Sequence, residues 1–369
     1  MSSAKFQDSI CYPLEGSTVH RTDLDTALAA FDPENFGFIP FQSGWVKETA
    51  RFGSIVICTL DWEHAQAASY DYDGVDRREM DALNLMVRLQ DRTWGMPPED
   101  LVPVNLLAVL GDTGGANIVA YQLDKGFNSD GWLGFVIGAG SATGTLVSHM
   151  LGVHETIRGV RDIGWYLKIV QAYLALQNGH HCMSWTFDPM RGANARLNLE
   201  KLGARIDELA INKYGVLRSV LYGDVPSDRF LAKWDLLSTR THERIDAVYH
   251  RRHPDHSAED LLDVPELNVE TAPEFAIQQP ARLRYRIPGD IDHLMRQDPH
   301  AAIHWREEMR QALTGFLTTK IGVAGDVEQY GPVAIHIETH PGPYSIASFA
   351  TGHNEVDERV SYYVLERRD

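Results

Sequence analysis

The sequence predicts an α/β protein with a mixed, mostly antiparallel sheet flanked by helices, an N-terminal extension and a C-terminal α+β unit. Three observations support this fold class. Apolar segments with short connections follow one another over residues 102–153, and short connections favour antiparallel neighbours because a parallel crossover needs about a dozen residues. A helical period follows over residues 162–178, and further strand and helix patterns fill residues 281–369.

Residues 1–75 form the expected N-terminal extension, in which Ser54–Leu60 has the β-branched composition of a strand. Arg77–Trp94 is predicted to be a helix because its apolar residues recur at helical spacing. The helix ends before Pro97 and Pro98, since proline cannot continue a helix.

Four strands are predicted to follow this helix: Val102–Leu110, Asn117–Tyr121, Gly131–Ile137 and Thr145–Val153. The glycine-rich residues 138–144 between the last two imitate a dinucleotide-binding fingerprint. Such a turn must open a helix, whereas a strand pattern follows here. An NAD(P)-dependent oxidoreductase is therefore less favoured.

The pattern then alternates between helices and strands up to residue 236. The amphipathic helix over residues 162–178 stops at Asn178-Gly179, a common helix end. The elements predicted after it are a strand, a helix and two more strands: His181–Phe187, Gly192–Leu202, Ala204–Ile211 and Phe230–Leu236. Residues 76–236 are accordingly interpreted as the core domain.

Prolines and charged residues fill residues 237–280, which predicts a linker or irregular loop. A C-terminal α+β unit is expected over residues 281–369. It contains a strand at Arg282–Ile287, a helix around Pro299–Thr318 and a last strand at Ser361–Leu365, for which Val333–Ile337 is the candidate neighbour.

Composition excludes several classes of protein. Asp and Glu number 51 against 34 Lys and Arg, a net charge of −17, which disfavours nucleic acid and anionic membrane as partners. The three cysteines lie far apart, which disfavours a disulfide scaffold or a cysteine-rich zinc site. With no signal-peptide pattern and no membrane-length apolar run, a soluble cytoplasmic protein is expected.

Several motifs resemble a poorly characterised bacterial subgroup of the GNAT N-acyltransferases. They are Ser148-His-Met-Leu-Gly-Val153, Trp185-Thr-Phe-Asp-Pro189 and Asn194–Ala204, with Asp298-Pro299, Trp305-Arg306 and Tyr363–Arg367 towards the end. The order of predicted elements over residues 77–236 also resembles the GNAT fold. The first 75 residues carry no such resemblance.

This resemblance implies a transferase of the acyltransferase or acetyltransferase type. It would move an acyl group from acetyl-CoA or a larger acyl-CoA to the amine of a small molecule or amino acid, by direct attack in a ternary complex. The alternative is a catalytically altered GNAT-like binding or regulatory protein, because the phosphate loop and the usual acid depart from the family pattern.

The resemblance also implies the residues that hold coenzyme A. Backbone groups of Leu151, Gly152 and Val153 would pair with the pantetheine arm, and Asn194 would contact the cofactor. The loop carrying Arg158, Gly159, Arg161 and Gly164 precedes a helix, and free backbone N–H groups there suit a pyrophosphate. This loop departs from the family pattern Gln/Arg-x-x-Gly-x-Gly/Ala. Asp162 is awkward beside an anion, unless it caps the helix.

Acyl transfer to an amine needs a general base and a proton for the leaving thiolate. Strand alternation places His149 on one face with Val147, Leu151 and Val153, so it is either the general base or a core histidine. Glu155 and Asp188 follow strand ends expected to face the cleft, as catalytic groups or as caps. Leu199 stands where many GNATs have a tyrosine acid, and Tyr214 is the substitute candidate.

No metal is predicted. His336, Glu338 and His340 share a strand face, as a metal half-site or as an exposed polar face. The absence of a GxSxG elbow disfavours a hydrolase. The C-terminal unit is expected to pack over the acceptor end of the cleft, or else to form a homodimer surface.

Overall fold

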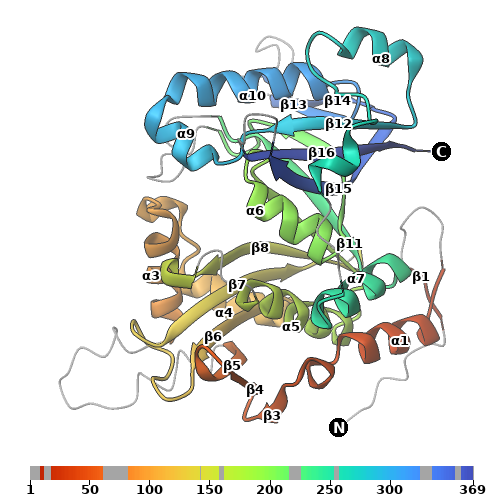
Figure 1. The fold of residues 1–369 in the computed structure, drawn as a ribbon. Coiled ribbons are helices and arrows are strands. Elements are labelled where there is room, and N and C mark those ends of the chain that lie inside the picture. The colour runs from red at the N-terminus through yellow and green to blue at the C-terminus, as the bar shows by residue number, and fades with distance from the viewer. Residues whose placement is uncertain are drawn as a thin grey trace. The chain divides into compact units, whose positions relative to one another are not determined.

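The computed structural model describes residues 9–11, 18–60, 82–141, 143–157, 162–215, 226–252, 257–324, 335–353 and 359–368. The chain forms two compact units (Figure 1). The N-terminal unit comprises Met1–Ser184 and Asp235–His242, and the C-terminal unit comprises Trp185–Trp234 and Glu243–Asp369.

A mixed sheet forms the centre of the N-terminal unit. Its neighbours are antiparallel from β3 through β8, and β9 joins β8 in parallel. The strands are β3 (Ile39–Phe41), β4 (Gly44–Thr49), β5 (Gly53–Leu60), β6 (Ala116–Gln122), β7 (Trp132–Gly140), β8 (Thr145–Val153) and β9 (Cys182–Phe187). A separate two-stranded sheet pairs β1 (Ser9–Cys11) with β2 (Thr18–His20).

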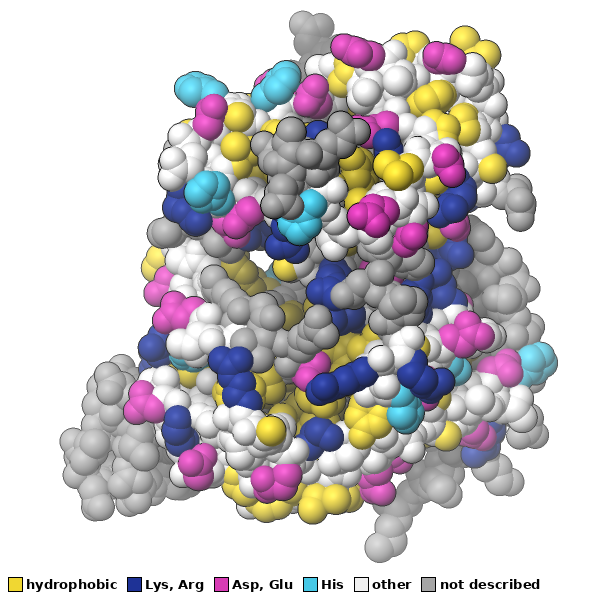
Figure 2. All heavy atoms as spheres, viewed as in Figure 1, with side chains coloured by type: hydrophobic (Ala, Val, Ile, Leu, Met, Phe, Trp, Pro, Cys, Tyr) yellow, Lys and Arg dark blue, Asp and Glu magenta, His cyan; other side chains and the backbone are white. Residues whose placement is uncertain are grey.

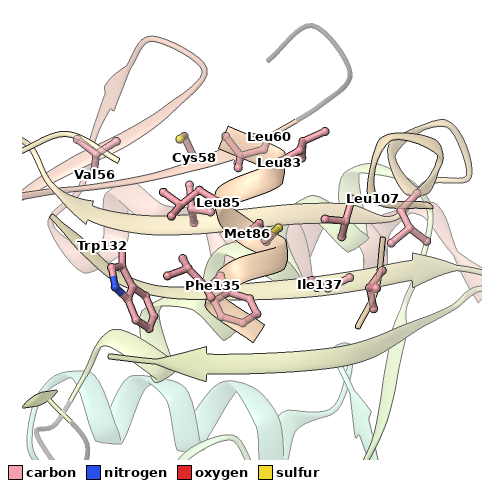
Figure 3. Packing of buried hydrophobic residues seen from close by; sticks show 14 residues of the cluster. Val56, Cys58, Leu60, Leu83, Leu85, Met86, Leu107, Trp132, Phe135 and Ile137 are labelled. Atoms are coloured by element: carbon pink, nitrogen blue, oxygen red, sulfur yellow. The ribbon is translucent and has the colours of Figure 1, made fainter. Parts of the chain in front are cut away.

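Helices cover both faces of this sheet. They are α1 (Arg21–Phe31), α3 (Ala82–Trp94), α4 (Val104–Asp112) and α5 (Ile163–Gln177), with the short turns η1 (Pro33–Phe36), η3 (Pro98–Asp100) and η4 (Glu155–Ile157). On one face, α3 and α4 pack on β5, β6 and β7, where Met86, Leu107 and Phe135 belong to one buried cluster (Figure 3).

Helix α5 packs on the opposite face, and glycines of β7 allow its close approach. A Cβ atom added to Gly138 would lie 2.8 Å from Nε2 of Gln171, and one added to Gly134 would lie 3.0 Å from Cδ1 of Leu167. Gly138 therefore serves packing between strand and helix. Beyond it, the described residues of the glycine-rich segment lead from β7 into β8 and open no helix.

Within the C-terminal unit, neighbouring strands follow the order β11–β10–β15–β16–β12. Strand β13 pairs in parallel with β10, and β14 pairs antiparallel with β13. The strands are β10 (Arg205–Ile211), β11 (Arg229–Asp235), β12 (Arg282–Ile287), β13 (Thr318–Ala324), β14 (Ile335–His340), β15 (Tyr344–His353) and β16 (Arg359–Arg367).

The remaining helices belong wholly or largely to this unit. They are α6 (Gly192–Ala195), which continues into the π-helical turn η5 (Arg196–Lys201), α7 (Thr239–Tyr249), the turn η6 (Ala258–Leu261), α8 (Ala272–Gln278), α9 (Ile291–Gln297) and α10 (Pro299–Leu313). Helix α10 begins at a proline and is capped by the Asp298 carboxylate, which accepts a hydrogen bond from the Ala301 amide.

The predicted fold class, a mixed and mostly antiparallel α/β architecture flanked by helices, is confirmed, but three element predictions are wrong. The predicted strand Val102–Leu110 is helix α4, because a short apolar run has no period that separates a buried strand from a buried helix. The predicted loop over residues 237–280 contains α7, η6 and α8. The last strand pairs with β12 and β15, whereas β14, which includes part of its predicted neighbour, pairs with β13.

The boundaries between the two units fall after Ser184, Trp234 and His242. The domain boundaries predicted from the sequence were at residues 75, 236 and 280. Strand β10 of the predicted core pairs with β13 and β15 of the predicted tail. These pairings join residues more than a hundred positions apart in sequence, so no local pattern could indicate them.

Acidic and basic side chains are interspersed on the faces seen in Figure 2. In the part of the chain that the structure describes, no helix is both long and apolar enough to span a bilayer.

Candidate active site

Strand β8 carries a β-bulge at His149. Ile137 of β7 pairs with Met150 and Gly138 pairs with Ser148, so His149 is the extra residue between them. Its side chain is exposed, and no hydrogen-bond partner is recorded for it among the described residues. Partial desolvation lowers the pKa of His149 below 6.5, so its imidazole is neutral at neutral pH and can accept a proton.

The bulge overturns the predicted face of this strand. On the N-terminal side of the bulge, Ser148 is buried and hydrogen-bonds to Gln171 of α5. On the C-terminal side, Leu151 and Val153 also lie against α5: a Cβ atom added to Gly164 would be 3.6 Å from Cδ2 of Leu151 and 3.7 Å from Cγ1 of Val153. Strict alternation would group His149 with Leu151 and Val153, but one inserted residue changes the parity of all later positions. Ser148 therefore shares the α5 side of the strand with Leu151 and Val153, which strict alternation does not predict.

One edge of β8 is paired over a short length. Its ladder with β9 covers only Thr145–Val147 and Cys182–Ser184, whereas β8 continues to Val153 in pairing with β7. Within the described residues, the backbone groups of Ser148–Val153 on this edge have no strand partner. An extended ligand with amide groups can hydrogen-bond to such an edge.

Helix α5 starts beside the end of β8. Asp162 occupies the N-cap position, as one interpretation of the sequence proposed, but its side chain makes no capping hydrogen bond and its φ is +116°. The Tyr166 amide donates to the Asp162 carbonyl at 2.7 Å, so the amides of residues 163–165 have no acceptor within the helix. The predicted phosphate-binding residues Arg158, Gly159 and Arg161 lie outside the described residues.

A lysine from the N-terminal extension lies near this helix start. Lys47 on β4 donates to the Phe36 carbonyl at 2.5 Å, and its Nζ lies 5.5 and 5.6 Å from the ring centres of Phe38 and Tyr166. Desolvation lowers the pKa of Lys47, and the nearby Asp162 carboxylate opposes that shift. Lys47 therefore offsets part of the negative charge of Asp162.

A buried polar cluster links α5 to β8 next to the bulge. Lys168 donates a hydrogen bond to Oγ of Ser148 at 2.6 Å. The Ser148 hydroxyl in turn donates to Oε1 of Gln171 at 2.8 Å, and Nζ of Lys168 lies 3.4 Å from the same Oε1. All three side chains are buried. Desolvation lowers the pKa of Lys168 well below 10.5. The signal for this cluster was available in the sequence, since Lys168 and Gln171 stand three residues apart in an otherwise largely apolar helix.

Replacing Lys168 with methionine should flatten the pH dependence of stability. In wild type the unfolded chain binds more protons at this position than the folded chain, between the lowered pKa and 10.5. The free energy of unfolding therefore rises with pH in that window, by up to about 1.4 kcal/mol per pH unit. Urea unfolding at several values between pH 6 and pH 9 measures the slope. The exposed Lys125→Met is the control, and equal slopes in wild type and Lys168→Met would contradict the prediction.

Asp188 directly follows β9, belongs to the C-terminal unit and is fully buried. Both of its carboxylate oxygens accept hydrogen bonds from Arg306 of α10, at 3.0 and 2.8 Å, and the Met190 amide donates at 3.0 Å. Burial by itself raises the pKa of Asp188, but Arg306, Arg229 and Arg191 together lower it below 3.8. Asp188 thus stabilises the C-terminal unit, and we leave it out of the proposed catalytic group.

Glu155, Tyr214 and Asn194, also predicted as site residues, lie outside β8. Glu155 is exposed in η4. It follows Val153, the last residue of β8, which is four residues from His149 and therefore about 13 Å away along the strand at ~3.3 Å per residue. Tyr214 and Asn194 belong to the C-terminal unit. The Tyr214 hydroxyl lies 2.9 Å from that of Thr186, and Asn194 is exposed on α6.

Among the residues that the structure describes, no group of three or more His, Cys, Asp or Glu side chains is arranged to hold a metal ion. Glu338 and His340 of β14 are exposed and lie 3.7 Å apart. The side chain of His336, the third residue of the predicted half-site, lies outside those described.

No protein-family model matches the sequence, and no curated protein matches it. Solved structures similar to part of the chain are acetyltransferases. A putative GNAT-family acetyltransferase from Desulfovibrio desulfuricans has 14% identity over 49% of this chain and 99% of its own, with a TM-score of 0.33. The ribosomal-protein-S18-alanine N-acetyltransferase from Escherichia coli has 12% identity over 49% of this chain and 94% of its own, with a TM-score of 0.34. A putative acetyltransferase from Salmonella typhimurium, solved with its cofactor acetyl-CoA, has 15% identity over 49% and 94%, with a TM-score of 0.33.

Proposed function

We propose that this protein is an N-acyltransferase that moves an acyl group from an acyl-CoA to the amine of a small molecule or amino acid. The observation that carries the proposal is one edge of β8. Among the described residues this edge has no strand partner over Ser148–Val153, it includes the bulged His149, and it ends beside the start of α5.

The chemistry of the donor suits this edge. The pantetheine arm of CoA is extended and carries amide groups, which can pair with the backbone of Leu151, Gly152 and Val153. At the start of α5, backbone N–H groups have no acceptor within the helix, and the helix dipole has its positive end. Both features favour binding of the pyrophosphate. Arg158, Gly159, Arg161 and Gly164 remain the proposed residues of that loop, and Lys47 opposes the charge of Asp162.

In the proposed reaction, the neutral imidazole of His149 accepts a proton from the substrate ammonium or attacking amine. The amine nitrogen forms a bond to the thioester carbonyl carbon, and the bond from that carbon to sulfur breaks. One proton leaves the amine and one reaches the thiolate, so the products are an amide and free CoA thiol.

Release of CoA thiol from the full-length protein tests this function. Acetyl-, succinyl- and longer acyl-CoA donors are combined with a panel of small amines and amino acids, and free thiol is measured with DTNB. We expect thiol release that requires both donor and amine, together with a melting temperature raised by CoA and not by NAD(P).

Two other outcomes would reject the proposal in different ways. CoA binding without thiol release for any donor would favour a GNAT-like binding or regulatory protein. Failure of CoA to bind at all would remove the proposed role of the β8 edge and of the α5 start.

A further inference from the structure

The C-terminal unit contains a cavity of about 140 Å³ whose lining includes none of the residues of the proposed acyl-transfer site. Helix α10 contributes Trp305, Glu308 and Ala312 to its lining, and β12 contributes Tyr285 and Arg286. The segment 266–269, which precedes α8, completes it. A cavity of this volume has room for a small organic ligand.

The walls of this cavity are fixed by hydrogen bonds. The Leu267 amide donates to the Arg284 carbonyl at 2.8 Å, and the Arg284 amide donates to the Pro265 carbonyl at 2.9 Å. Oδ1 of Asn268 accepts from the amides of Glu270 and Thr271, at 2.9 Å each. The cavity is therefore formed before any ligand arrives, which lowers the entropic cost of binding.

The carboxylates of the lining are not equivalent. Glu266 lies 3.2 Å from a guanidinium nitrogen of Arg284, so its charge is compensated. Glu308 lies 3.7 Å from the exposed His304, and no Arg or Lys partner is recorded for it among the described residues. Arg286 is the single cation of the lining. With Glu266 paired to Arg284, Glu308 is the one carboxylate of this lining that has no Arg or Lys partner among the described residues.

Aromatic groups stand beside the uncompensated carboxylate. Tyr285 is 4% exposed, and no hydrogen bond of its hydroxyl is recorded among the described residues. Burial and the charge of Glu308 raise the pKa of Tyr285, so the hydroxyl stays protonated. Trp305 is half-buried one helical turn before Glu308. A carboxylate together with tyrosine and tryptophan rings is a combination that binds organic cations.

We propose that this cavity binds a small organic ammonium ion carrying one positive charge. Glu308 is its counter-ion, the Tyr285 oxygen accepts a hydrogen bond from the ammonium group, and Trp305 supplies aromatic surface. Arg286 restricts the ligand to a single charge, because it would repel a second ammonium group. The argument for this site does not rest on the proposed acyl transfer.

Isothermal titration of the full chain with a series of primary amines from methylamine to pentylamine, including isobutylamine, tests the proposal directly. Three matched probes accompany them. Isobutanol lacks the charge of isobutylamine, L-valine adds a carboxylate to isobutylamine, and 1,4-diaminobutane adds a second ammonium group to butylamine. We expect millimolar or tighter binding of at least one monoamine. The corresponding alcohol and diamine should bind more weakly by about tenfold or more, since a charged hydrogen bond contributes about 1.5–3 kcal/mol.

Variants separate ligand binding from folding. Glu308→Gln should weaken monoamine binding by about tenfold or more, whereas Glu307→Gln, an exposed neighbour on α10, should leave it unchanged. Tyr285→Phe should weaken binding without lowering the melting temperature, because it removes only a hydroxyl with no recorded protein partner. The proposal is overturned if no monoamine binds, if Glu308→Gln binds like wild type, or if L-valine binds more tightly than isobutylamine.

Discussion

Replacing Arg306 with alanine is expected to destabilise the C-terminal unit by about 3–5 kcal/mol, because it leaves the Asp188 carboxylate buried without its main counter-charge. Both side chains are almost completely buried, at 3% and 1% exposure, so bulk solvent does not screen the charge of the carboxylate. Chemical denaturation followed by circular dichroism measures the change in the free energy of unfolding.

The dependence on pH identifies the ion pair as the cause. Because the pKa of Asp188 is lowered below 3.8 in the fold, its stabilising contribution is present above that value and is lost as pH falls through the folded pKa. Arg306→Ala should therefore lose less stability than wild type on acidification. Arg296→Ala, at an exposed position on α9, is the control and should change stability by no more than about 0.5 kcal/mol. Equal effects of the two substitutions would contradict the prediction.

This ion pair shows which part of the structure local patterns can predict. The motifs Trp185-Thr-Phe-Asp-Pro189 and Trp305-Arg306 were visible as separate segments of the sequence. That Asp188 and Arg306 are partners, 118 positions apart, was not visible, because periodicity and turn signals report only on neighbouring residues. The same limit explains why the pairing of β10 with β13 and β15 was missed.

Elements with a strong local period were predicted well, and the errors come from breaks in that period. The predicted bounds Thr145–Val153 are those of β8, because a glycine precedes this largely apolar segment and polar residues follow it. Its side-chain faces were predicted wrongly, because the assumption of strict alternation cannot anticipate an inserted residue at His149. The buried Lys168 was overlooked because lysine usually occupies exposed helix positions.

The bulged histidine leads to the second large expected effect, which rests on the proposed acyl transfer. Replacing His149 with glutamine is expected to lower kcat by about 10²–10⁴-fold, the contribution of a general base. Steady-state assays of CoA thiol release measure the loss. The Kd for CoA should stay within about twofold of wild type, because the groups proposed to hold the donor belong to the backbone of Leu151–Val153 and to the α5 start.

The pH profile then distinguishes a general base from a residue that only shapes the strand. A base must be neutral to accept a proton, and desolvation lowers the pKa of His149 below 6.5. Wild-type kcat/KM should therefore fall on the acidic side through an apparent pKa below 6.5, and this limb should be absent from His149→Gln. The exposed His20→Gln should retain the wild-type profile. An unchanged acidic limb in His149→Gln would exclude His149 as the base, because a residue that is missing cannot titrate.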